Sequence, residues 1–145
     1  MKKSMNWLLL ALLAAFCFGA YNVFMKIASG YIHEITGAVI LQFVAAIAGL
    51  AILLYIKYGT NEVITISQKG IMYSVLAGLC VGGAEILSFV VFGKGVPAST
   101  GIPIIIGGAI VVGTVIGMLF LKEKITTLHV LGTVLIILGI LLVSR

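Results

Sequence analysis

Long apolar runs separated by short polar breaks follow one another along almost the whole chain. The breaks are SGYIHEITG (29–37), YGTNEVITISQKG (58–70), GKGVPAST (93–100) and KEKITT (122–127). Runs of about 20 apolar residues are long enough to cross a bilayer core as α-helices. We therefore predict five transmembrane helices, at residues 7–29, 35–58, 70–92, 99–121 and 128–143, within a single membrane domain that covers residues 1–145.

Composition supports the same class. Hydrophobic residues make up 62% of the chain and charged residues only 9%, whereas about a quarter of the residues of a soluble domain are charged. The mean hydropathy is +1.31. Short strands of alternating polarity, which a membrane β-barrel needs, are missing from the sequence. The expected fold class is an all-α integral membrane protein, multi-pass, in the cell membrane (inner or plasma membrane).

The start of the chain, MKKSMNWLLLALLAAFCFGA, is similar in pattern to a secretory signal peptide. Its apolar run, however, continues to Val23 and Phe24, beyond a typical signal-peptide core. We interpret it as an uncleaved first helix. Cys17 and Cys80 lie inside apolar runs, where we expect small buried side chains rather than a disulfide or a metal pair.

The basic residues indicate the topology. With an odd number of helices the two termini lie on opposite sides. The side of the N-terminus then holds Lys2, Lys3, Lys57, Lys69, Lys122 and Lys124, and the other side holds Lys26, Lys94 and Arg145. This six-to-three bias favours a cytoplasmic N-terminus, although it leaves insertion in both orientations open. The net charge of +5 is assigned to topology and lipid head groups, not to nucleic acid.

Small residues recur at helical spacing in several of the predicted helices. Helices in lipid associate mainly by close packing, which small residues allow. We therefore predict helix-packing or gating positions in the first, third and fourth helices: Gly19, Gly82, Gly107, Gly108, Gly113 and Gly117. The fifth helix has two small residues seven apart, Gly132 and Gly139, which suit helix packing as well.

Glu85, in CVGGAEILSFVVFG (80–93), is the one acidic residue in the middle of an apolar run. A charge at membrane depth is costly, so such residues usually face a bundle interior or a watery cavity. Helical spacing places Glu85 on the same face as Gly82 and Ser88, which indicates an inward orientation. An acid there suits a site that exchanges a proton for a cation, or one that holds a cation. The alternative is a structural Glu bonded to a neighbouring polar side chain.

Polar positions from four helices fall at a similar depth, if residues are counted from the non-cytoplasmic helix ends at about 1.5 Å per residue. Asn22 and Glu85 lie about seven residues from that end, as does Gln42, and the pair Gly107–Gly108 lies only slightly deeper. We predict a shared hydrated cavity at this depth, bordered by Tyr21. The candidate substrate- or ion-binding residues are Glu85, Asn22, Gln42, Tyr21 and Ser88.

Enzyme signatures are missing from the sequence. It contains no Asp, and His33 and His129 are near the ends of different runs, so we expect no catalytic residues and no metal site. The glycines of GLCVGG and GIPIIIGG lie within apolar helices and follow no strand, which excludes a phosphate-binding loop. We therefore expect no cofactor.

Two stretches resemble the EamA branch of the drug/metabolite transporter superfamily. FCFGAYNVFMKIAS (16–29) is similar to the first-helix signature of that family, with Phe18-Gly19 and Lys26 in the matching places. Residues 93–144 contain a G-x-x-P-A type entry to the fourth helix, an L-x-E-x-h-T turn at 121–126, and a last helix punctuated by Gly132 and Gly139. The resemblance covers nearly the whole chain.

The resemblance implies a half-transporter. Family members commonly have ten helices in two five-helix repeats of opposite orientation, so this chain is expected to pair with a second copy or with a homologous half, in parallel or antiparallel orientation. The resemblance also makes the last helix a candidate dimerisation element, with Gly132 and Gly139 as the dimerisation positions, although ordinary packing within one chain fits these two glycines equally well. The first-helix carboxylate of small multidrug relatives is absent here, and family motifs give Glu85 no role.

Three functions follow from these observations. The first is a dimeric secondary transporter of a small metabolite or cation, proton-coupled through Glu85 and working by alternating access. The second is half of a flippase for a lipid or a lipid-linked sugar, and the third is a non-transporting membrane subunit. Reconstitution in liposomes separates the three functions. Solute or proton flux would support the transporter, lipid scrambling would support the flippase, and neither activity would support the non-transporting subunit.

Overall fold

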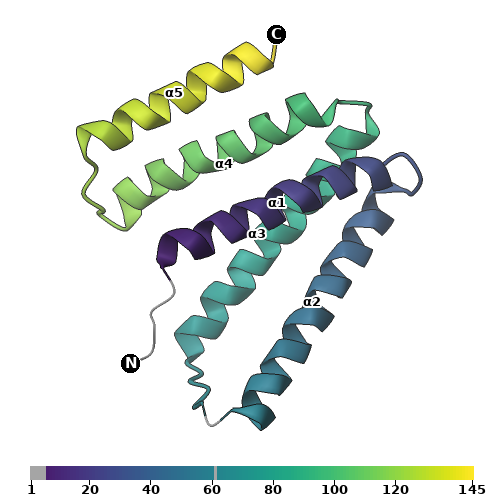
Figure 1. Cartoon of the computed structure of the whole chain (residues 1–145), viewed down its shortest axis with the longest axis vertical. Helices are drawn as coiled ribbons and strands as arrows, with labels where there is room; N and C mark the ends of the chain where they lie inside the picture. The colour runs from purple at the N-terminus through teal and green to yellow at the C-terminus, as the bar shows by residue number, and fades with distance from the viewer. Residues whose placement is uncertain (1–5, 61) are drawn as a thin grey trace. The chain divides into compact units, whose positions relative to one another are not determined.

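The computed structural model describes residues 6–60 and 62–145, and all regular structure within them is helical. The helices are α1 (Trp7–Ala28), α2 (Glu34–Gly59), α3 (Gln68–Gly93), α4 (Ala98–Phe120) and α5 (Thr127–Val143) (Figure 1). Helices α1 to α4 are long and apolar enough to cross a membrane, whereas α5 has 17 residues and is shorter. The predicted all-α membrane class is confirmed. Lys2 and Lys3, on which the topology prediction partly depends, lie outside the described residues.

The chain forms two compact units, which are described separately below. The first contains residues up to Lys26 and Gly95–Arg145, and therefore α1 nearly to its end, α4 and α5. The second contains Ile27–Lys94, and therefore α2 and α3.

In the second unit, α2 and α3 pack side by side in opposite directions (Figure 1). The Phe89 ring of α3 lies directly against Gly37 of α2, and a Cβ atom built on Gly37 would lie only 2.5 Å from Phe89 Cε1. Ala38 and Phe92 are also fully buried. Gly37 thus allows the two helices to approach closely around one aromatic side chain.

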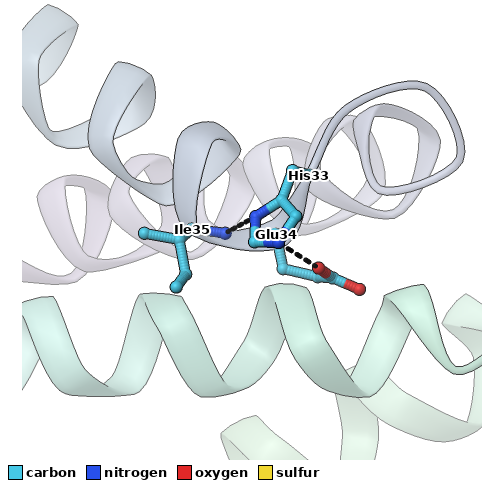
Figure 2. Close-up of polar contacts among 3 residues, drawn as sticks. All are labelled: His33, Glu34 and Ile35. Carbon is cyan, nitrogen blue, oxygen red and sulfur yellow. Dashed lines mark hydrogen bonds and ion pairs between the residues drawn. The ribbon is translucent and has the colours of Figure 1, made fainter.

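The N-terminal ends of α2 and α3 are capped by side chains, as helices in a globular protein often are. The Ile35 backbone N–H donates to His33 Nδ1 at 3.3 Å, and His33 Nε2 lies 3.8 Å from Glu34 Oε2 (Figure 2). On α3 the Gly70 N–H donates to Ser67 Oγ at 3.1 Å. These caps satisfy backbone donors that have no partner within the first turn of a helix.

In the first unit, α4 and α5 form a second antiparallel pair (Figure 1). Gly107 is the point of closest approach, because a Cβ atom there would lie 2.9 Å from Ile140 Cδ1. The turn between the helices depends on Lys122, whose φ of 54° is in the left-handed region. The N–H groups of Leu121 and Glu123 both donate to the Gly117 carbonyl, and the chain then enters α5.

Candidate functional site

The predicted acid, Glu85, is buried on α3. Glu85 is 8% exposed and Ser88 is 6% exposed. Three residues before Glu85, Gly82 gives space to the Gln42 side chain of α2, whose Oε1 lies 3.2 Å from where a Gly82 Cβ would be. Residues three and four apart are neighbours on a helix surface, so Glu85 lies about one turn along α3 from the Gln42–Gly82 contact. Gln42 thus contacts Gly82 of α3, and the buried residues Glu85 and Ser88 follow within the next two turns of the same helix.

Asn22 of α1, in the first unit, is 1% exposed. Its Nδ2 group donates to the Phe18 carbonyl one turn earlier, at 2.8 Å. Its Oδ1 atom is buried and accepts no hydrogen bond from the described residues. A buried acceptor without a partner is costly and is a natural place for a donor group of a ligand or for a water molecule. Tyr21 beside it packs edge-on against Phe18, with ring centroids 5.7 Å apart.

The small residues of α1 line an open groove against α4. The groove has a volume of about 850 Å³ and a mainly apolar surface. Ala11, Ala15 and Gly19 lie on its α1 side, and Pro103 and Gly107 lie on its α4 side. The predicted small face of the first helix therefore borders a space rather than a tight helix–helix contact.

The predicted glycines divide into two groups in the structure. Gly82, Gly107 and Gly117 lie against other side chains, and at Gly117 the neighbour is the Glu123 carboxylate, whose Oε2 lies 2.9 Å from the Cβ position. At the remaining positions a Cβ atom would meet no atom of the described residues within 4 Å, apart from its chain neighbours and the backbone of its own helix. They are Gly19, Gly108, Gly113, Gly132 and Gly139.

Two close contacts were missed by the sequence reasoning. The first is the contact between Gly37 and the Phe89 ring. At the end of the same helix pair, Glu34 Oε1 lies 2.6 Å from where a Gly93 Cβ would be. Spacing on one helix cannot show which residue of another helix faces a glycine, so the sequence held no signal for either pair.

The expectation that the cysteines are buried is wrong. Cys17 and Cys80 are both free thiols, and both are exposed on the surfaces of their helices. Each helix uses another face for packing, and an apolar thiol is equally compatible with a lipid-facing position. Among the described residues, no group of three or more His, Cys, Asp or Glu side chains is placed to hold a metal ion.

Comparison with known proteins identifies the family. The sequence matches the EamA-like transporter family over residues 5–145, nearly its full length. The chain belongs to the EamA-like transporter family. It is also 35% identical over 138 residues to MJ1333.1 of Methanocaldococcus jannaschii, an uncharacterised protein, with 94% of this chain and 95% of that protein covered. No solved structure matches the chain significantly.

Membership of the EamA-like family, within the drug/metabolite transporter superfamily, identifies this chain as a membrane transporter protein. Members of the family are transporters rather than enzymes. The lipid bilayer and a small-molecule substrate are the partners that membership implies. The predicted resemblance is thereby confirmed.

Proposed function

We propose that this EamA-like chain is one half of a secondary transporter for a small metabolite or cation. It works as a dimer of five-helix units by alternating access, and Glu85 couples transport to protons. The observation that carries the proposal is the buried carboxyl of Glu85 beside the Gln42–Gly82 contact. Ionisable side chains within membrane helices usually serve an ion or substrate pathway.

Each predicted site residue has a role in this proposal. Glu85 binds the proton or the transported cation, and Gln42 and Asn22 bind polar groups of the substrate. The buried Oδ1 of Asn22, which accepts no hydrogen bond from the described residues, supports this role because it would accept one from a substrate N–H or O–H. Tyr21 and Ser88 border the pathway. Gly107 and Gly108 allow close approach or bending of α4.

The dimer follows from the number of helices. Transporters with inverted repeats bind substrate between two related halves and rock one half against the other. A chain with a single set of five helices needs a second copy or a homologous half to provide that interface. Mass photometry of the purified chain tests this step, and a strictly monomeric particle that still transports would contradict it.

Electrophysiology on solid-supported membranes tests the transport claim. Proteoliposomes with the wild-type chain are exposed to a panel of metabolites and organic cations, and the Glu85→Gln variant is compared with it. Glu62→Gln is the matched control, because Glu62 is exposed in the segment between α2 and α3. We expect substrate-induced currents in the wild type and the control, and none in Glu85→Gln. Wild-type currents in Glu85→Gln would rule out the role of Glu85.

A second candidate function is half of a lipid or lipid-linked-sugar flippase. The apolar, open groove between α1 and α4 favours it, because such a groove suits an acyl or polyprenyl chain. Scrambling of a fluorescent lipid by the same proteoliposomes, without solute currents, would favour the flippase. Neither activity would point to a non-transporting membrane subunit.

A further inference from the structure

A second open groove runs between α4 and α5, entirely within the first unit. Its volume is about 520 Å³. One end lies next to the turn between the helices and contains the polar side chains of Thr126 and His129, together with Leu128. The other end is apolar and is lined by Ile110 and Ile136. Ten residues separate Thr126 from Ile136, so polarity falls along the helix axis over about 15 Å.

In the middle of this groove, the two threonine side chains have no free hydroxyl hydrogen to donate to a ligand. The hydroxyl of Thr114 donates to the Ile110 carbonyl, and that of Thr133 donates to the His129 carbonyl, both at 2.9 Å. Both hydroxyl hydrogens are therefore used within their own helices. A sugar or a peptide at this depth would find no donor on either threonine, whereas an acyl chain would need none.

The side chain of His129 gives the polar end a hydrogen-bond donor that suits an anion. His129 Nδ1 lies 2.6 Å from Thr126 Oγ1 and accepts from the Thr126 backbone N–H at 3.4 Å. Because Nδ1 accepts, we assign the proton of the neutral ring to Nε2. The Thr126 hydroxyl oxygen in turn accepts from the His129 N–H, so the first turn of α5 is capped by its own side chains. One of the first-turn N–H groups of α5, that of His129, is therefore already bonded within the protein.

Charge in the adjoining turn also favours an anion. Lys122 and Lys124 are both exposed there, on either side of Glu123. The Glu123 carboxylate folds back against Gly117 in the last turn of α4. The three residues carry a net charge of +1, from two lysines and one glutamate. A basic segment at the end of membrane helices attracts acidic lipid, at about 1 kcal/mol per lysine.

We propose that the α4–α5 groove binds one anionic phospholipid. Its phosphate lies against Lys122, Lys124 and the Nε2–H group of His129, and one acyl chain follows the groove toward Ile110 and Ile136. The polarity gradient matches an amphiphile whose head group lies at the membrane surface. Gly132 leaves room for the chain, since a Cβ atom there would meet no described atom within 4 Å. This site is separate from Glu85 and does not depend on the proposed transport activity.

Native mass spectrometry of the full chain tests the head-group contacts. The protein is titrated with phosphatidylglycerol, and with phosphatidylcholine as the neutral comparison. The double variant Lys122→Gln/Lys124→Gln should bind phosphatidylglycerol between about fivefold and about thirtyfold more weakly, with phosphatidylcholine unchanged. The control is Lys57→Gln/Lys69→Gln, which removes two lysines of the second unit. Equal losses in both double variants would overturn the proposal, because they would show only a general charge effect.

A second pair of variants tests the acyl-chain contacts. Gly132→Leu fills the groove, whereas Gly139→Leu places the same side chain two turns further along α5, at a position equally free of described neighbours. We expect loss of the bound phosphatidylglycerol in Gly132→Leu and retention in Gly139→Leu, with unchanged circular dichroism. Unchanged lipid binding in Gly132→Leu would overturn the proposal. A change of oligomeric state without lipid loss would show instead that a second copy of the chain occupies the groove. If Gly132→Leu does not fold, the comparison of the two lysine double variants still tests whether the groove binds an anionic phospholipid.

Discussion

Gly37 offers the sharpest test of how α2 and α3 pack, because alanine at this position has two opposing effects. Alanine is favoured over glycine within a helix by about 0.8–1 kcal/mol. Its Cβ, however, would lie 2.5 Å from Phe89 Cε1, 2.8 Å from Cζ and 3.0 Å from Cδ1. Phe89 is 2% exposed, so its ring has little space to move. Overpacking of a tight core costs about 1–3 kcal/mol.

The two effects can be separated with a control on the same helix. A Cβ atom on Gly49 would meet no described atom within 4 Å, so Gly49→Ala should show the helix-propensity gain alone. We expect Gly37→Ala to be less stable than Gly49→Ala by about 1–3 kcal/mol. The free energy of unfolding is measured by titration with sodium dodecyl sulfate in mixed micelles, followed by circular dichroism.

A double-mutant cycle shows whether Phe89 is the cause. Phe89→Leu removes Cε1 and Cζ, the two ring atoms closest to the new Cβ, so Gly37→Ala should cost less in a Phe89→Leu background than in the wild type. Equal costs in the two backgrounds, or a Gly37→Ala variant as stable as Gly49→Ala, would refute the close approach of α2 and α3 at this point.

Two further substitutions test other glycine positions by the same unfolding titration. Gly107→Ala should be destabilised by about 1–3 kcal/mol relative to Gly108→Ala, because only the first brings a Cβ atom to 2.9 Å from Ile140 Cδ1; equal stability of the two would contradict the α4–α5 contact. Gly95→Ala should cost about 1–2 kcal/mol, since its φ of +89° is unfavourable for a residue with a Cβ. Gly95→Asn should cost less, and a larger cost for Asn than for Ala would contradict the backbone argument.

The number and type of helices could be predicted because hydropathy alone determines them. Each apolar run is long, and each break contains Gly, Pro or charge. Even α5, with 17 residues, is marked by the KEKITT turn before it. A resemblance to the family was also visible in short motifs at residues 16–29 and 93–144, because family motifs are local in sequence.

Helix pairing could not be predicted, because it depends on which faces meet. Gly107 and Gly108 are equivalent in sequence, yet only Gly107 lies against α5. Gly37 and Gly93 carried no signal, because their partners Phe89 and Glu34 lie on another helix. The cap of α5 was missed for a different reason: His129 takes the place that Glu or Gln holds in the usual capping box.

Some features of the candidate site could be predicted from the sequence. The inward orientation of Glu85 follows from its spacing to Gly82 and Ser88, and the burial of Glu85 and Ser88 agrees with it. The sequence marks Gln42 and Gly82 as separate candidate positions, and the structure shows that they are in contact. The layer shared by four helices stays a prediction, and the transport experiments address it.

Proton flux measured with a pH-sensitive dye inside proteoliposomes shows whether Glu85 couples transport to protons. For a substrate found in the electrophysiological panel, we expect substrate addition to move protons in the wild type and in Glu62→Gln. In Glu85→Gln, substrate addition should move none, while circular dichroism shows the same helix content. Substrate-driven proton flux at the wild-type rate in Glu85→Gln would mean that Glu85 is not the coupling residue.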